Sequence, residues 1–187
     1  MTRFATRGLV LSLAIALTAC GGGAGEPGSV TPDAPVTLEA GPPELAADVV
    51  AMERTCAPER DERCDALDSD CDGRIDEGCE GAVHGEVEVA VAWSGPADLD
   101  LELDGPGGAR ERVVACEEGP RIERHAVPEA AAGRYAVSLR HADACGGEGP
   151  VTASVTVAVR GEVLGTFNRA VAPGAEAPVV GFELRAP

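Results

Sequence analysis

The chain has 187 residues, with 32 acidic and 15 basic side chains, and its formal net charge at pH 7 is −17. This charge argues against nucleic acid and against anionic lipid surfaces as partners, because both are bound through clustered positive charge. A hydrophobic fraction of 44% excludes a wholly disordered chain, while 24 Gly, 14 Pro and an aromatic fraction of 3% favour turns, linkers and a β core of small side chains.

Residues 1–19 have the layout of an export signal. Two arginines precede an apolar run over residues 8–19, whose 12 residues are too few to span a bilayer. The run leads into Leu17-Thr18-Ala19-Cys20, which resembles the lipobox of bacterial lipoproteins. The resemblance implies cleavage before Cys20, lipidation of Cys20, and an exported protein that is anchored by lipid in the cell envelope, at the outer membrane or cell surface. The alternative is an ordinary signal peptide that a cysteine happens to follow.

Residues 20–50 are expected to form a flexible linker behind the lipidated cysteine. The segment is rich in Pro and Gly and contains acidic residues but no basic one. Such a composition buries too little apolar surface to offset the entropy of ordering the chain. We therefore divide the rest of the chain into an Asp-rich module over residues 51–81 and a β domain over residues 82–187.

Six cysteines remain after Cys20, and an even number in an exported chain predicts three disulfides. These six are Cys56, Cys64, Cys71, Cys79, Cys116 and Cys145. The first four lie within 24 residues, so we expect them to pair among themselves, in an order that remains open, and the last two to pair with each other. Zinc binding by the first four is the alternative. Zinc sites favour pairs separated by about two to four residues, and here seven, six and seven residues separate neighbours.

Alternating aspartates mark the Asp-rich module as a candidate calcium site. Aspartates at i, i+2, i+4 and i+8, with Gly73 at i+5, have the spacing that opens an EF-hand loop, although Cys79 stands where that loop has its last glutamate. Calcium takes about six to eight oxygen ligands, and glycine permits the sharp turn that brings alternating carboxylates together. The alternative is a solvated acidic surface. The expected ligands are the side chains of Asp68, Asp70, Asp72 and Asp76, the carbonyl of Arg74, and a carboxylate from Asp65 or Glu77.

Residues 62–79 follow the pattern E-x-C-D-x-x-D-x-D-C-D-G-x-x-D-E-x-C. This pattern resembles a bacterial metal-binding-motif family and, less closely, the Cys-braced Asp-rich loops of thrombospondin type 3 repeats. The resemblance covers residues 56–79 and implies a bound metal without fixing its identity. Calcium is favoured because every candidate ligand is a hard oxygen. Copper would require His, Met or free thiolate, and magnesium accepts fewer protein ligands.

From residue 82 onward, apolar and polar residues alternate with a period of two, which predicts antiparallel strands packed on one face. In residues 97–103 the leucines should face the core, and Asp98, Asp100 and Glu102 should lie on the opposite, polar face. Seven or eight short strands in about 105 residues, separated by Gly- and Pro-rich turns, predict a β-sandwich. The strands are expected over residues 86–93, 97–103, 134–140, 151–159 and 179–184, with weaker candidates at 110–115, 122–127 and 163–170.

The β domain also carries a spaced motif made of Trp93, Asp98, Leu99, Asp100, Leu101, Pro106 and Gly107, then Gly133, Tyr135 and Val137, then Val155–Gly161. This order is similar to secreted bacterial β-sandwich modules of the pre-peptidase C-terminal type. The resemblance covers residues 84–184 and implies an accessory, non-catalytic module. Asp98 and Asp100 are candidate ligands of a second calcium ion at an end of the sandwich. A polar strand face beside a turn explains these two aspartates equally well.

The sequence offers no catalytic constellation. Its histidines, His84, His125 and His141, show no metal-binding spacing, and nucleophile-elbow and phosphate-loop motifs are missing. We therefore expect a non-enzymatic surface protein with a structural or adhesive role, in which calcium stiffens a stalk below the sandwich. The alternatives are a module that binds polysaccharide or protein, or an accessory domain of a secreted hydrolase system. An aromatic platform for polysaccharide could come only from Trp93 and Tyr135, and both fall on expected core faces.

Overall fold

The computed structural model describes residues 38–106, 110–112, 116 and 121–186, and the side chains of residues 110–112 are outside this description. The expected signal segment and Cys20 also lie outside the described residues. Within the described part of the chain, every regular element is a β-strand. No helix there is long and apolar enough to cross a membrane.

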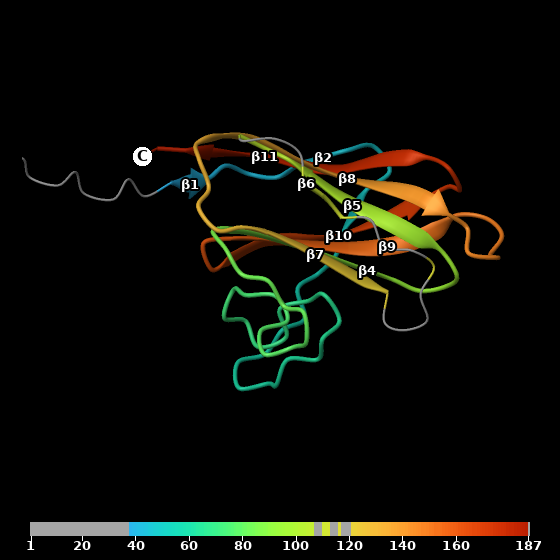
Figure 1. Cartoon of the computed structure of the whole chain (residues 1–187). Helices are drawn as coiled ribbons and strands as arrows, with labels where there is room; N and C mark the ends of the chain where they lie inside the picture. The colour runs from blue at the N-terminus through green and yellow to red at the C-terminus, as the bar shows by residue number, and fades with distance from the viewer. Residues whose placement is uncertain (1–37, 107–109, 113–115, 117–120, 187) are drawn as a thin grey trace, which may run out of the picture. The chain divides into compact units, whose positions relative to one another are not determined.

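The strands form two antiparallel sheets that face each other as the layers of a sandwich (Figure 1). Sheet A contains, in spatial order, β1 (Glu39–Ala40), β11 (Glu176–Arg185), β8 (Gly133–Asp143), β5 (Asp98–Asp104) and β6 (Arg110–Arg112), and β2 (Glu44–Leu45) also pairs with β11. Sheet B contains, in spatial order, β3 (Val50–Ala51), β10 (Glu162–Val171), β9 (Val151–Val159), β4 (Val87–Trp93) and β7 (Ile122–Val127). The mainly-β class and the sandwich are thereby confirmed. Every strand expected after residue 82 is present, and residues 113–115 of one weaker candidate lie outside the described part.

The core lies between the two sheets and is built from the apolar positions that alternate along each strand. Valines of β4 and β9 in sheet B face leucines of β5 and β8 in sheet A, and nearly all of them are fully buried. The rings of Tyr135 and Phe182 stack with their centroids 5.3 Å apart. Tyr135 is buried and Trp93 packs half-buried against the core, so neither forms the exposed platform that polysaccharide binding would use.

The expectation of a flexible linker up to residue 50 is wrong for its described part. Residues 38–51 contribute three short strands, which pair with β11 and β10 at the margins of the two sheets. Strand pairing explains why these residues have a defined structure, because the N–H and C=O groups at a sheet edge form hydrogen bonds when another strand lies beside them. Strands of only two residues are too short to leave a periodic pattern in the sequence.

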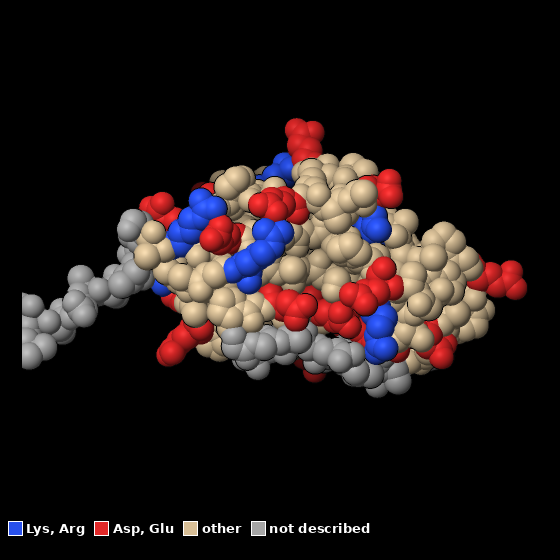
Figure 2. All heavy atoms as spheres, turned by 90° about the horizontal axis from the view of Figure 1, so that it is seen from above, with Lys and Arg blue, Asp and Glu red and all other residues tan. Residues whose placement is uncertain are grey.

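The outer face of sheet A carries exposed ion pairs. Arg134 of β8 contacts Glu44 of β2 with an N–O distance of 2.8 Å, and Arg185 contacts Glu183 within β11 at 2.5 Å. Figure 2 shows this face, on which basic and acidic side chains lie interspersed. Exposed pairs of this kind contribute little to the free energy of folding, so their main effect is on the surface charge.

Two aspartates of the polar face expected for β5 are buried. Asp98 and Asp100 are 6% and 0% exposed, although they alternate with the core leucines of the strand. The backbone N–H of Leu101 donates to Glu123 Oε2 at 2.8 Å, and His125 Nε2 lies 2.7 Å from the carbonyl oxygen of Leu101. Glu123 and His125 thus close this side of the sandwich over β5.

Candidate metal site

Two interleaved disulfides hold the Asp-rich module. Cys56 is bonded to Cys71 and Cys64 to Cys79, and each bridge spans 15 residues of sequence. The expected pairing among these four cysteines is confirmed, and their oxidation rules out the alternative of zinc thiolates, which require free sulfur. The bridges supply order where secondary structure does not, since residues 52–81 form only turns and bends.

The module packs against the outer face of sheet B (Figure 1). Its side chains Ala66 and Ile75 are buried and form a small apolar cluster with Ala90 of β4 and Ala158 of β9. The small alanine side chains of the sheet let the loop backbone approach closely. The module and the sandwich therefore share buried surface, and the expected stalk is instead a layer on the sheet.

Gly73 makes this close approach possible. Its φ is +89°, and a Cβ built at this position would lie 1.8 Å from the carbonyl oxygen of Gly161, in the turn between β9 and β10. The sequence predicts a glycine here for the turn of the loop alone. The contact with the neighbouring hairpin adds a second reason, which depends on the tertiary structure.

Five carboxylates of the module converge in two overlapping groups. One carboxylate oxygen from each of Asp68, Asp70 and Asp72 lies within 4.8 Å of the others, and the same holds for Glu62, Asp70 and Glu77. Asp70 belongs to both groups. A span of this size is about twice a calcium–oxygen distance of about 2.4 Å, so an ion can contact several of these oxygens at once. We call these five residues the loop cluster.

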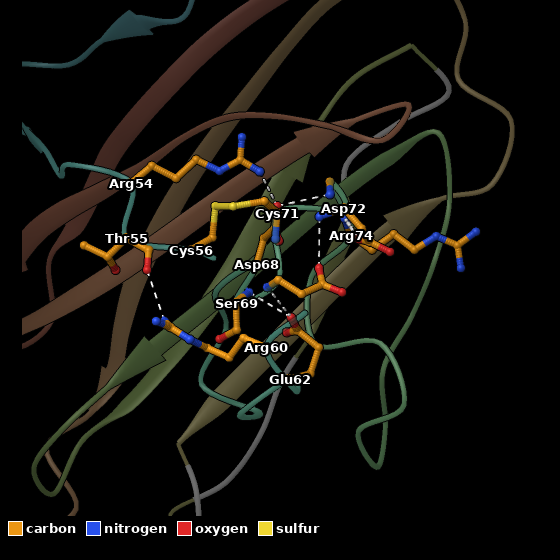
Figure 3. Close-up of a disulfide and its surroundings, with 12 residues drawn as sticks. Arg54, Thr55, Cys56, Arg60, Glu62, Asp68, Ser69, Cys71, Asp72 and Arg74 are labelled. Carbon is orange, nitrogen blue, oxygen red and sulfur yellow. Dashed lines mark hydrogen bonds and ion pairs between the residues drawn. A yellow bond between two sulfur atoms is a disulfide. The ribbon is translucent and has the colours of Figure 1, made fainter. Parts of the chain in front are cut away.

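Backbone turns orient two of the aspartates. Asp70 Oδ1 accepts the N–H of Asp72 at 2.9 Å, and Asp72 Oδ1 accepts the N–H of Arg74 at 2.8 Å. Both are the local turns that aspartate side chains commonly form with the backbone two residues on. The Arg74 side chain is exposed and points away from the acids in Figure 3, as expected for a residue that would use only its carbonyl.

Asp68 is the most enclosed member of the loop cluster. Its side chain is 2% exposed, its Oδ1 accepts the N–H of Cys71 at 2.6 Å, and its Oδ2 accepts the N–H of Gly73 at 3.1 Å. Its carboxylate also pairs with Arg54, which lies beside the Cys56–Cys71 bridge (Figure 3). These contacts fix the position of Asp68 before any ion binds.

Glu62 belongs to the loop cluster although the sequence analysis did not propose it as a ligand. Its Oε1 accepts the N–H groups of Ser69 and Asp70 at 2.8 and 3.1 Å, which ties it to the aspartate segment (Figure 3). The only sequence signal was its match to the metal-binding-motif pattern. Spacing alone could not place it, because the chain must fold back between residues 62 and 69.

The electrostatics of the loop cluster favour neutralisation. Burial raises the pKa of Glu62, and the neighbouring carboxylates of Glu77 and Asp70 raise it further. Burial likewise raises the pKa of Glu77, with the charges of Asp72, Asp70 and Asp68 adding to the effect. Glu62 Oε2 and Glu77 Oε2 are buried and have no hydrogen-bond partner among the described residues. Buried carboxylate oxygens are normally hydrogen-bonded, protonated or bound to a metal.

Two of the expected ligands lie outside the loop cluster. Both oxygens of Asp76 accept the N–H of Ala66 at 3.0 Å, and its Oδ2 pairs with Arg124 of β7. Asp65 lies 3.7 Å from Arg63 and does not join either group of converging oxygens. Asp76 therefore anchors the module to sheet B. Among the converging carboxylates, Glu62 is present and Asp76, which spacing had predicted, is not.

The other predicted residues lie in the β domain. Asp98 and Asp100 form a separate group with Glu123. Cys116 and Cys145 are bonded to each other with a Cα–Cα distance of 5.5 Å, as expected.

Comparison with protein families, with curated proteins and with solved structures finds no match for this chain. The resemblances to a lipobox, to a metal-binding motif and to a secreted β-sandwich module thus rest on the residues quoted for them. The site is a disulfide-braced group of hard oxygen ligands on the face of an antiparallel β-sandwich.

Proposed function

We propose that the loop cluster binds one calcium ion and that the protein is a non-catalytic, lipid-anchored protein of the bacterial envelope with a structural or adhesive role. The observation that carries the proposal is the convergence of five carboxylates in two groups that share Asp70, and two of the five have a buried oxygen without a hydrogen-bond partner in the described part of the chain. Hard oxygen ligands alone suit calcium, and free thiolates, which softer metals prefer, are consumed by the disulfides.

Binding would neutralise the mutual repulsion within the loop cluster. Asp68, Asp70 and Asp72 would supply one side of the coordination shell, and Glu62 and Glu77 the other. The ion would thereby connect the loop after Cys64 to the segment before Cys79. Calcium in this position would stiffen the module on sheet B, so that the tethered sandwich presents a rigid unit to its surroundings.

The proposal is tested by calorimetric titration of the oxidised protein with Ca²⁺, with Mg²⁺ and Cu²⁺ as comparison ions. Residues 35–187 form one compact unit and are suitable as the titrated protein. We expect saturable calcium binding with a Kd of about 10⁻⁴–10⁻³ M, the range of extracellular modules. The variant Asp70→Asn with Asp72→Asn should lose the binding step that belongs to the loop cluster.

Asp61→Asn is the matched control, because Asp61 is an exposed acid of the same module outside both groups of converging oxygens. Its isotherm should equal that of the wild type. Equal calcium binding by the double variant, or a step lost to the same extent in Asp61→Asn, would refute a specific site in the loop cluster.

A further inference from the structure

A second acidic cluster lies in the β domain, at the side of the sandwich where β7 reaches β5. Asp98 and Asp100 of sheet A and Glu123 of sheet B each offer one oxygen, and these oxygens lie within 4.8 Å of one another. The three residues, which we call the strand cluster, are 6%, 0% and 1% exposed. They lie where β7 of sheet B approaches the edge of β5 in sheet A, and none of them belongs to the disulfide-braced loop.

The strand cluster is more than a group of acids, because it contains buried oxygens that no described residue satisfies. Asp98 Oδ1 and Asp100 Oδ1 are buried without a hydrogen-bond partner among the described residues. Arg140 binds Asp100 through the other oxygen, Oδ2, at 3.0 and 2.6 Å. Arg121 directs Nη1 to the carbonyl oxygen of Ala97 at 2.8 Å. In these contacts, Arg121 and Arg140 therefore leave Asp98 Oδ1 and Asp100 Oδ1 uncontacted.

The local charge balance also favours a cation. Burial raises the pKa of Asp98, the carboxylates of Asp100 and Asp143 raise it further, and the opposing effects of Arg121 and Arg140 do not cancel this rise. Asp143 lies opposite Asp98 in the β5–β8 pairing, next to a β-bulge. Bulges redirect side chains at sheet margins and are frequent beside functional sites.

We propose that the strand cluster is a second divalent-cation site, in which Asp98, Asp100 and Glu123 bind one calcium ion at the edge of β5, where β7 approaches it. The ion would link β5 of sheet A to β7 of sheet B, at a place where Glu123 and His125 already contact the backbone of Leu101. Glu123 already accepts the N–H of Leu101 through Oε2, which positions its carboxylate for this role. All three protein ligands are carboxylates, which suits calcium better than softer ions.

The sole tryptophan provides a probe for this site. Trp93 Nε1 donates to the carbonyl oxygen of Ala97 at 2.9 Å, and Ala97 directly precedes Asp98. Excitation of Trp93 should therefore sensitise the luminescence of Tb³⁺, a substitute for calcium, bound at the strand cluster. We expect saturable Tb³⁺ luminescence that excess Ca²⁺ displaces, both in the wild type and in the Asp70→Asn, Asp72→Asn variant of the loop cluster.

Asp98→Asn should weaken Tb³⁺ and Ca²⁺ binding at this site at least about tenfold, because one of three carboxylate ligands loses its charge. Glu102→Gln is the matched control, since Glu102 lies on the same strand outside the cluster, and it should leave the luminescence unchanged. Unchanged luminescence in Asp98→Asn, or its loss in the loop variant instead, would overturn the proposal.

Calorimetry of the loop variant keeps the proposal testable even if Asp98→Asn fails to fold, because that variant leaves the strand cluster intact. It should still bind about one Ca²⁺ per chain. Absence of any remaining calcium step in the folded loop variant would show that the strand cluster is balanced by protons and arginines alone. The same titration separates this site from the one under Proposed function, since each variant removes a different step.

Discussion

Asp70 and Asp76 belong to one short segment but lie in different environments. The Asp76 side chain is 0% exposed, and its charge is balanced by Arg124, which is itself only 10% exposed. Asp70 is half-buried and faces other carboxylates of the loop cluster. Removing a charge from a buried pair leaves its partner unsatisfied, whereas removing one from a group of like charges relieves repulsion. The two residues should therefore separate stability from metal binding.

Asp76→Ala should lower the free energy of unfolding by about 3–5 kcal/mol, because Arg124 is left buried without its carboxylate. Asp70→Ala should change it by less than about 1 kcal/mol when calcium is absent, yet remove calcium binding at the loop cluster. Urea unfolding in the presence of a chelator, followed by calcium titration of each folded variant, measures both effects. Similar stability losses in the two variants would contradict this assignment.

Glu62 and Glu77 should give the calcium-free protein a specific pH dependence. Both have pKa values raised above the ordinary 4.5, so the folded state takes up protons more readily than the unfolded state. Their contribution to the free energy of unfolding should rise as the pH falls from the raised values to the ordinary one, and calcium affinity should fall over the same range. Urea unfolding in the presence of a chelator, from about pH 7 to about pH 4.5, measures the change in the free energy of unfolding. Calorimetric titration over the same pH range measures the change in calcium affinity. The double variant Glu62→Gln, Glu77→Gln should lack this part of the pH dependence of the free energy of unfolding. A pH dependence equal to that of the wild type would contradict the assignment to Glu62 and Glu77.

At the scale of elements, the module is held on sheet B by contacts with individual strands and one turn. Ile75 donates its N–H to Glu88 Oε2 of β4 at 3.4 Å, and Asp76 pairs with Arg124 of β7. Gly73 meets the β9–β10 turn at Gly161. The loop is thus held against two strands and one turn, and its tightest contact is backbone against backbone. A side chain added at this contact cannot be accommodated by rotation about its own bonds.

Gly73→Ala should destabilise the protein by about 2–5 kcal/mol, from about 1–2 kcal/mol for a left-handed alanine and about 1–3 kcal/mol for overpacking against Gly161. Gly78 is the matched control, because its φ is +80° but a Cβ there meets nothing within 4 Å. Gly78→Ala should lower the free energy of unfolding by only about 1–2 kcal/mol, the cost of a left-handed alanine. Equal losses in the two variants, measured by urea unfolding, would mean that the contact with the turn is not tight.

At the scale of the whole molecule, local periodicity predicted the sandwich but not how its margins close. Alternating valines and leucines identify the long strands because each strand has one face in the core. The burial of Asp100 and the role of Glu62 depend instead on segments distant in sequence, namely β7 and the fold of the disulfide-braced loop. Spacing likewise groups Asp76 with the loop aspartates, whereas in the structure it pairs with Arg124, 48 residues away. Spacing predicts the kind of site, and tertiary contacts decide which carboxylates converge.

Shared packing also predicts that the module and the sandwich unfold together. Calcium at the loop cluster should then shift the unfolding transition of the sandwich, by about 1.4 kcal/mol at a calcium concentration ten times the Kd. Trp93 fluorescence reports the sandwich, and the measurement is made in the Asp98→Asn background, in which calcium binding at the strand cluster is weakened. If calcium binds there while the Trp93 transition stays in place, the two parts unfold independently.

The interleaving of the two disulfides has a consequence for proteolysis. A peptide bond cut anywhere between Cys64 and Cys71 is spanned by both the Cys56–Cys71 and the Cys64–Cys79 bridge. The two fragments therefore stay joined at two points, and Asp68 and Asp70 remain tethered beside Asp72 and Glu77. A loop without helices or strands can in this way survive nicking by a protease, with its carboxylates still held close together.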